Sequence, residues 1–262
     1  MAIQTPTLLK LSNILPMPPD LSNIVYQYID SPFITTIIVD TDSNIISCFI
    51  TSTYDSMIDW GDNTYDILTS GKNKLTHVYK RLGIYIIHMY GEITHIIDVN
   101  YFSHIREISQ WGNLSLSECR GLFKGHSNLK ITAVDSLNLQ YTTDLSYMFD
   151  GCKYFTGDLS RWDVSNIVNM KNMFAGCLLF NSDLSKWNVS KVTNMEKMFY
   201  KCNSFNSNIN NWNVKNVFNA AYMFYECNSF KFRLSKWDVS NVIHMEFLFD
   251  GCPMAYAYYF PH

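Results

Sequence analysis

The sequence predicts an α+β protein in which a small antiparallel β-sandwich is followed by a solenoid of 25-residue coils, each with a short strand and a short helix. Two observations predict this class. Residues 148–252 repeat at a constant interval of 25, and such a period indicates stacked coils, because an insertion would break the alignment of their buried columns. The segment before the repeats consists instead of short β-rich runs.

The first two parts of the chain differ in composition. Residues 1–32 hold five of the seven prolines and show little periodicity, which predicts an extended N-terminal arm. Residues 33–100 contain the runs FITTIIVD, IISCFIT, SMIDW, IYIIHMYG and THIIDV, separated by turn residues. These runs predict the strands of the sandwich.

Residues 101–252 form the predicted solenoid, and residues 253–262 form an aromatic tail. Each repeat carries a Met-Phe pair (Leu-Phe in the last), a cysteine and, between neighbouring pairs, a tryptophan. The recurring residues are Met148-Phe149, Met173-Phe174, Met198-Phe199, Met223-Phe224 and Leu248-Phe249, then Cys152, Cys177, Cys202, Cys227 and Cys252, then Trp162, Trp187, Trp212 and Trp237. All are predicted to be buried.

One repeat illustrates the predicted coil. The spacing of Leu184, Trp187 and Val189 is typical of a short strand with inward side chains, and Ser190 is a candidate helix N-cap. Four apolar residues then follow the i, i+3, i+4, i+7 spacing of one helix face, namely Met195, Met198, Phe199 and Cys202.

The cysteine column is interpreted as part of the core. Helices in neighbouring coils would pack about 8–10 Å apart, farther than the roughly 4.4–6.8 Å between Cα atoms that a disulfide tolerates. The sequence has no Cys-x-x-Cys pair that would indicate a zinc site. Reduced thiols fit a protein that folds inside the cell.

No catalytic, cofactor or metal site is predicted. Gly71-Lys72-Asn73 lacks the flanking residues of a phosphate-binding loop, and the seven histidines show no ligand spacing. Asp59 and Asp62 are too few for calcium, so Asp62 is interpreted as a turn residue, and His77 as a structural residue at a β-edge.

Charge and hydropathy exclude two classes of partner. The formal net charge of -3 and the pI near 6.1 argue against nucleic acid. No apolar run approaches the roughly 20 residues that span a bilayer, so no membrane insertion is expected, and the first residues lack the features of a signal peptide. Other protein chains are the expected partners.

Two regions are candidate binding sites for other protein chains. The first is a pair of outward columns on the predicted strands, Arg161, Lys186, Asn211 and Lys236 beside Asp163, Asn188, Asn213 and Asp238. An equally weighted alternative is that these residues are solvated or hydrogen-bonded between coils. The second region is the tail, with Tyr256, Tyr258, Tyr259 and Phe260, which either folds over the last coil or stays open to a partner.

The repeat consensus L-S-x-W-[DN]-V-S-N-V-x-N-M-x-x-M-F-x-x-C-x-x-F-N resembles the BspA-like leucine-rich repeats of the bacterial surface-protein 26-residue type. Upstream, Trp60-Gly61-Asp62-Asn63-Thr64, His77-Val78-Tyr79 and Gly83-Ile84-Tyr85 resemble the signature of PKD-like sandwiches. The segment Ile108–Gly112 resembles the junction between the two.

These resemblances imply a non-enzymatic adhesion or interaction protein, usually on the surface of a bacterium or mycoplasma. Because no signal peptide is seen, we expect a structural component of a larger assembly, such as a virus capsid, located in the virion or in an intracellular assembly. The alternative is an adhesin-like binding protein at the cell surface. The expected partners are accordingly assembly subunits or a surface receptor.

Overall fold

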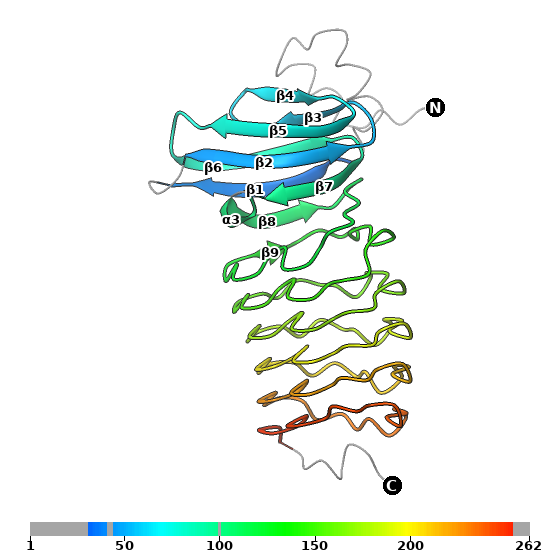
Figure 1. Cartoon of the computed structure of the whole chain (residues 1–262). Coiled ribbons are helices and arrows are strands. Elements are labelled where there is room, and N and C mark those ends of the chain that lie inside the picture. The colour runs from blue at the N-terminus through cyan, green and yellow to red at the C-terminus, as the bar shows by residue number, and fades with distance from the viewer. Residues whose placement is uncertain (1–30, 41–43, 99–100, 254–262) are drawn as a thin grey trace, which may run out of the picture.

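The computed structural model describes residues 31–40, 44–98 and 101–253. Figure 1 shows a strand-rich N-terminal part followed by stacked loops that end at the C-terminus. The predicted N-terminal arm before Ser31 and the aromatic tail after Pro253 lie outside the described residues. No helix in the described ranges is long and apolar enough to cross a membrane.

The β-rich runs form strands in two sheets. The strands are β1 (Phe33–Val39), β2 (Ile45–Ser52), β3 (Ser56–Asp59), β4 (Tyr65–Leu68), β5 (Gly71–Val78), β6 (Gly83–Tyr90), β7 (Ile93–Asp98), β8 (Ile105–Gln110) and β9 (Lys130–Ile131). One sheet has the order β4-β3-β6-β1-β8-β9, and the other has the order β5-β2-β7. All pairs are antiparallel except β8 with β9.

The two sheets share one core. Strand β1 alternates buried and half-buried residues, as expected for a strand with one face on a core. Its buried Ile37 belongs to the same apolar cluster as Ile46 and Ile50 of β2 in the other sheet. Figure 1 shows the smaller sheet lying across the larger one, so each sheet covers the apolar face of the other.

Strand β8 connects this part to the repeats. It pairs with β1 on one side and, in parallel, with the short β9 on the other. Beyond β8, the ring of Trp111 stacks on Phe33 at 6.1 Å and meets Trp162 edge-on at 5.7 Å. The apolar core is therefore continuous from the sheets into the repeats.

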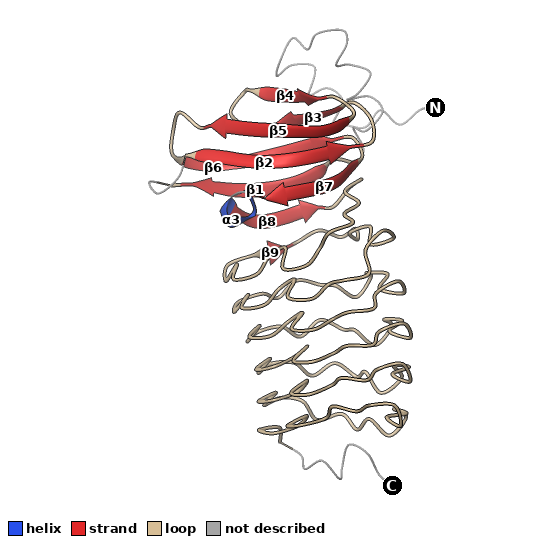
Figure 2. Cartoon of the chain, viewed as in Figure 1, coloured by secondary structure: helices blue, strands red, loops and turns tan. Residues whose placement is uncertain are grey.

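The predicted α+β class, a leucine-rich-repeat-like solenoid with a strand and a helix in each coil, is wrong. The described chain is almost entirely β and turn, and its one helix is the single turn α3 (Tyr101–His104), outside the 25-residue repeats. Residues 132–253 contain turns and isolated bridges, drawn as loops in Figure 2. The bridges join Asn169, Asn194 and Asn219, not the predicted strand at 184–189.

The predicted helix is replaced by overlapping turns, in which each hydrogen bond spans three residues rather than the four of an α-helix. The Met198 N–H donates to the Met195 carbonyl at 3.1 Å, and the Cys202 N–H donates to the Phe199 carbonyl at 2.9 Å. Lys201 has a φ of 58°, a left-handed conformation that a right-handed helix excludes. Two such turns give the same i, i+3, i+4, i+7 stripe of inward side chains as a helix face.

The turn segments are also joined to one another by hydrogen bonds. The N–H groups of Lys197, Phe199 and Lys201 donate to carbonyls of the next repeat, at 2.9, 3.0 and 2.7 Å. Alternate residues thus bond between repeats, as in a parallel sheet, and this sets the repeats about 4.8 Å apart. The spacing of 8–10 Å predicted from helix packing is therefore too large.

Aromatic and sulfur columns fill the inside of the stack. The rings of Phe149, Phe174, Phe199, Phe224 and Phe249 stack on their neighbours at 5.3–5.8 Å. The cysteines of the described ranges form no disulfides. From Cys152 to Cys252, each column thiol donates to the carbonyl of a phenylalanine 28 or 29 residues earlier. Four of the five column cysteines are buried, as predicted, and Cys252 is partly exposed.

Candidate functional site

The predicted binding columns lie on the outside of the repeats, in turns rather than on strands. The four residues of one column each accept a hydrogen bond from the backbone N–H two residues later, at 3.0–3.2 Å: Asp163, Asn188, Asn213 and Asp238. These side chains stabilise their own turns. The hydrogen bonds from Ser165 also hold the pKa of the Asp163 carboxyl below its usual range.

The second column consists of exposed residues, two of which contact each other. Lys236 Nζ donates to Asn211 Oδ1 at 2.8 Å, while Arg161 donates to the Val134 carbonyl at 2.8 Å. Lys186 is exposed beside Trp187. The binding role of both columns stays a prediction, as does that of Tyr256, Tyr258, Tyr259 and Phe260, which lie outside the described residues.

An aromatic cluster lies on the turn segments of the last three repeats. We call Tyr200, Tyr222, Tyr225 and Phe247 the aromatic patch. Tyr200 stacks on Tyr225 at 5.1 Å, Tyr222 stacks on Phe247 at 4.9 Å, and Tyr222 and Tyr225 are 5.9 Å apart. Phe247 is 51% exposed, and the three tyrosines are half-buried.

Charged side chains border the aromatic patch. Lys197 Nζ lies 5.3 Å from the ring centre of Tyr222, and Lys201 Nζ lies 5.4 Å from that of Tyr200. Lys201 also faces Glu226 at 3.7 Å, and the charges of Glu226 and Tyr200 raise the pKa of Lys201. Lys201 therefore remains cationic at neutral pH.

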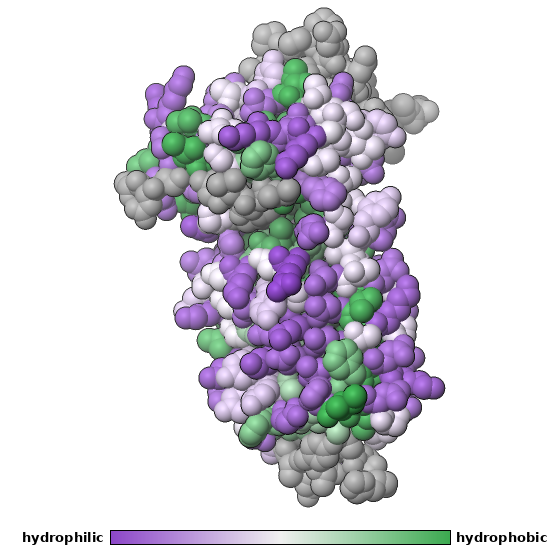
Figure 3. All heavy atoms as spheres, in the orientation of Figure 1, coloured by the Kyte–Doolittle hydropathy of each residue, from purple (hydrophilic) through white to green (hydrophobic). Residues whose placement is uncertain are grey.

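The patch borders a cavity at the C-terminal end of the stack. This cavity has a volume of about 640 Å³, and its lining includes Tyr225, Glu226, Phe247 and Asp250. Figure 3 shows polar residues over most of the repeats and apolar residues exposed near this end. Exposed aromatic side chains with charged neighbours are typical of a protein-binding site.

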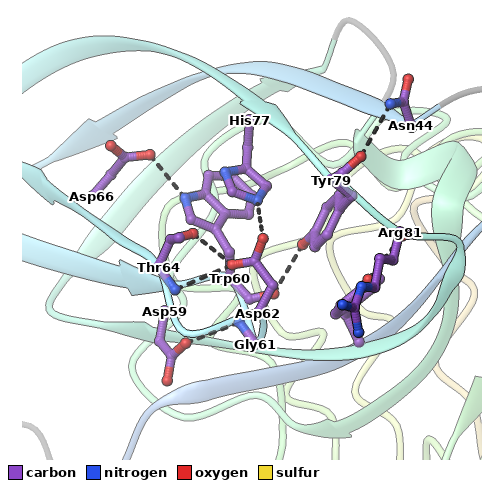
Figure 4. Close-up of polar contacts among 11 residues, drawn as sticks. Asn44, Asp59, Trp60, Gly61, Asp62, Thr64, Asp66, His77, Tyr79 and Arg81 are labelled. Carbon is purple, nitrogen blue, oxygen red and sulfur yellow. Dashed lines mark hydrogen bonds and ion pairs between the residues drawn. The ribbon is translucent and has the colours of Figure 1, made fainter. Parts of the chain in front are cut away.

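A second cluster lies among the sheets, around His77 of β5 (Figure 4). The His77 ring stacks on Trp60 at 4.6 Å, and His77 Nε2 lies 3.0 Å from Asp62 Oδ2. Trp60 Nε1 donates to Asp66, and the Tyr79 hydroxyl donates to the Trp60 carbonyl at 2.9 Å. His77 lies on an edge strand, which confirms its predicted position.

Asp62 has the predicted turn role in this cluster. It accepts hydrogen bonds from the backbone and hydroxyl of Thr64 as well as facing His77. Burial alone raises the pKa of Asp62, but these hydrogen bonds outweigh it, and its pKa lies below the usual value. No group of three metal-ligating side chains occurs in the described ranges, here or elsewhere.

Sequence reasoning missed the aromatic patch because its residues occupy variable positions of the repeat. Tyr222 and Phe247 stand where other repeats have Asn172 or Lys197, and Tyr200 and Tyr225 stand where one repeat has alanine. A consensus of the repeats records only the residues that recur, so it leaves out the positions that vary from one repeat to the next. A comparison of the variable positions alone would have shown aromatics gathering in consecutive repeats.

Comparison with known proteins identifies the family. The family model described as "Mycoplasma protein of unknown function, DUF285" matches residues 95–196 and residues 143–257, which together make up more than half of the chain. No curated protein and no solved structure compared with the chain matches it. The resemblances to BspA-like repeats and to PKD-like sandwiches are not confirmed. The chain belongs to the family of Mycoplasma proteins of unknown function, DUF285.

Proposed function

We propose that this chain is a non-enzymatic interaction module that holds another protein chain on its aromatic patch. The observation that carries this proposal is the exposure of Phe247, whose ring stacks on Tyr222. A second stacked pair, Tyr200 and Tyr225, adjoins it, and Lys197 lies over the Tyr222 ring. Tyrosine, phenylalanine and basic side chains are enriched in protein interfaces, and clustered aromatics supply much of their binding energy.

The proposed partner is a subunit of a larger assembly or a surface receptor. The family description names mycoplasma proteins of unknown function, which is compatible with an adhesin-like protein at a bacterial or mycoplasmal surface. The other setting, a virion or an intracellular assembly with the chain as a structural component, has no support from the family description.

Copurification with variants of the full chain tests this proposal. The bait Tyr222→Ser with Phe247→Ser removes half of the patch, and the matched control Tyr141→Ser with Tyr154→Ser removes two tyrosines that are 59% and 58% exposed elsewhere. We expect the wild type and the control to retain the same protein partner from source-cell lysate, and the patch variant to lose it.

A third bait tests the predicted columns. Lys186→Glu with Lys236→Glu reverses two charges of the exposed column without touching the patch. If this bait loses the partner and the patch variant retains it, the columns are the binding face and the patch proposal is wrong. Melting curves of all baits confirm that each is folded.

A further inference from the structure

We propose that the partner chain adds a basic segment to the last repeat, as one further turn segment that accepts hydrogen bonds from the N–H groups of Phe247 and Gly251. This inference rests on the proposed function, because the added segment lies beside the aromatic patch. It adds the backbone contacts and the charge of the partner.

The hydrogen bonds between turn segments all run in one direction. The turn segments are residues 145–151, 170–176, 195–201, 220–226 and 245–251. In each of the first four, the N–H groups of alternate residues donate to carbonyls of the next repeat. In the fourth, the Tyr222 N–H donates to the Glu246 carbonyl at 2.9 Å, and the Glu226 N–H donates to the Asp250 carbonyl at 2.7 Å.

The last segment presents equivalent donors at the end of the stack. The N–H groups of Phe247 and Gly251 stand where those of Tyr222 and Glu226 stand one repeat earlier, and they have no acceptor among the described residues. Phe247 and Gly251 also have positive φ, at 55° and 79°, as Tyr222 and Glu226 do. Backbone N–H groups held in this way form a concave site for acceptor atoms. The edge therefore requires a ligand that brings acceptors.

These donors lie at the cavity that the patch borders. Its lining includes Phe247, Asp250 and Gly251, and its volume of about 640 Å³ lies within the about 300–1,000 Å³ of ligand-binding pockets. Figure 1 shows the last repeat at the far end of the stack from the sheets, with no described repeat beyond it. The carbonyls of a peptide segment can therefore approach the donors along the direction of the stack.

The side chains at this edge favour a basic segment. In earlier repeats a lysine pairs with an acid of the next repeat, as Lys171 does with Glu196 at 2.8 Å. Glu246 stands in the same column, and within the described ranges its ion-pair partner is His244, at 3.4 Å. Asp250 has no ion pair with a described residue. A lysine or arginine of the added segment would pair with these acids, whereas an anionic ligand would be repelled.

The lysines of the patch do not oppose this charge. Lys197 and Lys201 belong to a repeat two steps before the last one, or about 9.6 Å away along the stack. Glu226, in the repeat between them and the edge, faces Lys201 at 3.7 Å. The acids Glu246 and Asp250 therefore set the charge at the edge itself.

A second copy of this chain does not fit the edge. Two last repeats facing each other would place N–H donors against N–H donors. The matching carbonyls, those of Arg120 and Leu122, belong to the first repeat and face away from the second. Figure 1 shows the two sheets on that side of the first repeat, where the last repeat of another copy would have to lie. The added segment therefore comes from a different chain.

A synthetic peptide of the repeat itself supplies the probe. Residues 169–177 with Cys177→Ser give NMKNMFAGS, which has no acid and carries Lys171 in the column of Glu246. Within the stack, this segment already accepts N–H donors of the preceding repeat on its carbonyls. It therefore has the backbone and the charge that the inference assigns to the partner.

Amide hydrogen exchange of the full chain tests the contact. In the free chain we expect the Phe247 and Gly251 amides to exchange quickly, and those of Tyr222 and Glu226 to be protected by their bonds to the last repeat. Saturating peptide should slow the exchange of Phe247 and Gly251 by at least about tenfold.

Peptides with one ester bond test the register. An ester weakens the preceding carbonyl as an acceptor and removes an N–H that points away from the last repeat. An ester between Ala175 and Gly176 should reduce the protection of Gly251 and leave that of Phe247. An ester after Lys171 should do the reverse, because the Lys171 and Ala175 carbonyls accept from the equivalent positions within the stack.

A charge reversal tests the basic character of the segment. Glu246→Lys should weaken peptide binding by about threefold, and a peptide with Lys171→Glu should bind this variant better than it binds the wild type. The matched control is Glu118→Lys, at an exposed acid beside the first repeat, which makes the same change in net charge and should leave the affinity unchanged. Amide shifts in an NMR titration give the affinities.

Four outcomes would overturn the inference. The first is an absence of protection by the peptide. The second is slow exchange of Phe247 and Gly251 in the free chain at every concentration, which assigns the edge to this chain's own residues. The third is protection that rises with chain concentration without peptide, which assigns it to a second copy. The fourth is protection by inorganic phosphate in place of the peptide, which assigns it to an anion.

The partner assay separates this inference from the proposed function. Glu246→Lys leaves the aromatic patch in place, so weaker retention of the partner by this bait, as well as by the patch variant, supports the edge contact. If the patch variant alone loses the partner, the edge contact is refuted and the proposed function stands. If the patch variant retains the partner, the proposed function is refuted, whatever the peptide shows.

Discussion

At the scale of single residues, two equally buried tryptophans differ in one hydrogen bond. Trp187 and Trp162 are each 4% exposed. Trp187 Nε1 donates to the Leu159 carbonyl at 3.0 Å, but Trp162 Nε1 finds no acceptor among the described residues. The pair therefore isolates the contribution of an indole hydrogen bond between repeats.

We predict that Trp187→Phe lowers the free energy of unfolding by about 1–2 kcal/mol more than Trp162→Phe. The first change removes the indole bond to the Leu159 carbonyl, which keeps its bond from the Trp162 backbone N–H, whereas the second removes a buried indole N–H that has no acceptor among the described residues. The two changes remove similar apolar area, so the difference reports the hydrogen bonding of the two indoles. Urea denaturation of both variants measures it. Equal losses would show that the Trp187 bond contributes nothing.

The cysteine column makes stability depend on pH. Burial raises the pKa of Cys152 to about 12 and those of Cys177, Cys202 and Cys227 well above the ordinary value of 9.0. These thiols stay protonated in the folded chain at a pH where they ionise in the unfolded chain. The contribution of these buried thiols to the free energy of unfolding is complete below about pH 8. It is lost as the pH rises, because the thiols then ionise in the unfolded chain but not in the folded one.

We predict that the free energy of unfolding falls above pH 9, with a slope approaching about 1.4 kcal/mol per pH unit for each buried column cysteine. Cys202→Ala removes one titrating group, so its slope should be shallower. Urea denaturation between about pH 7.5 and pH 9.5 checks both statements, where tyrosine ionisation contributes little. An identical slope in the variant contradicts the assignment.

At the scale of elements, the sequence predicted which repeat residues are buried but not the backbone that buries them. Met195, Met198, Phe199 and Cys202 are all fully buried, in agreement with the predicted stripe. A helix face and two consecutive turns place side chains at the same spacing, so periodicity could not separate them. The recurring glycine before the cysteine, as at Gly151 and Gly176, was the available signal, because it marks a left-handed residue.

Two repeats lack this glycine, which allows a direct test of the turn. Glu226 has a φ of 55° where Gly151, Gly176 and Gly251 occupy the same position. We predict that Glu226→Gly stabilises the fold by about 0.5–1 kcal/mol, since the left-handed conformation is strained for all residues with a Cβ. Its ion pair with Lys201 is exposed and contributes little.

The control for this change is Glu196→Gly, at a residue without positive φ. Here glycine relieves no strain, increases the entropy of the unfolded chain and removes the ion pair with Lys171, so stability should fall by about 1–2 kcal/mol. Thermal melts of both variants give the comparison. A loss of stability in Glu226→Gly would show that the second turn is not left-handed at this position.

At the scale of the whole molecule, one core runs from the two sheets through the repeats, and the repeats display their variable residues in columns. The strand runs of residues 33–98 were predictable, since alternation and turn residues are local signals. The aromatic patch was not, because Tyr200, Tyr222 and Phe247 come together only when three repeats stack in register. The binding surface therefore depends on the hydrogen bonds between turn segments.

The most direct measurement of that stacking is the through-hydrogen-bond NMR coupling between an amide nitrogen and its acceptor carbonyl carbon, in deuterated full-length protein. The structure predicts a coupling from the Phe199 nitrogen to the Met223 carbonyl, and from the Lys201 nitrogen to the Tyr225 carbonyl, in the following repeat. A helix would instead couple Phe199 to Met195 and Lys201 to Lys197, four residues earlier. Couplings of that second kind would contradict the turn-built stack and, with it, the aromatic patch.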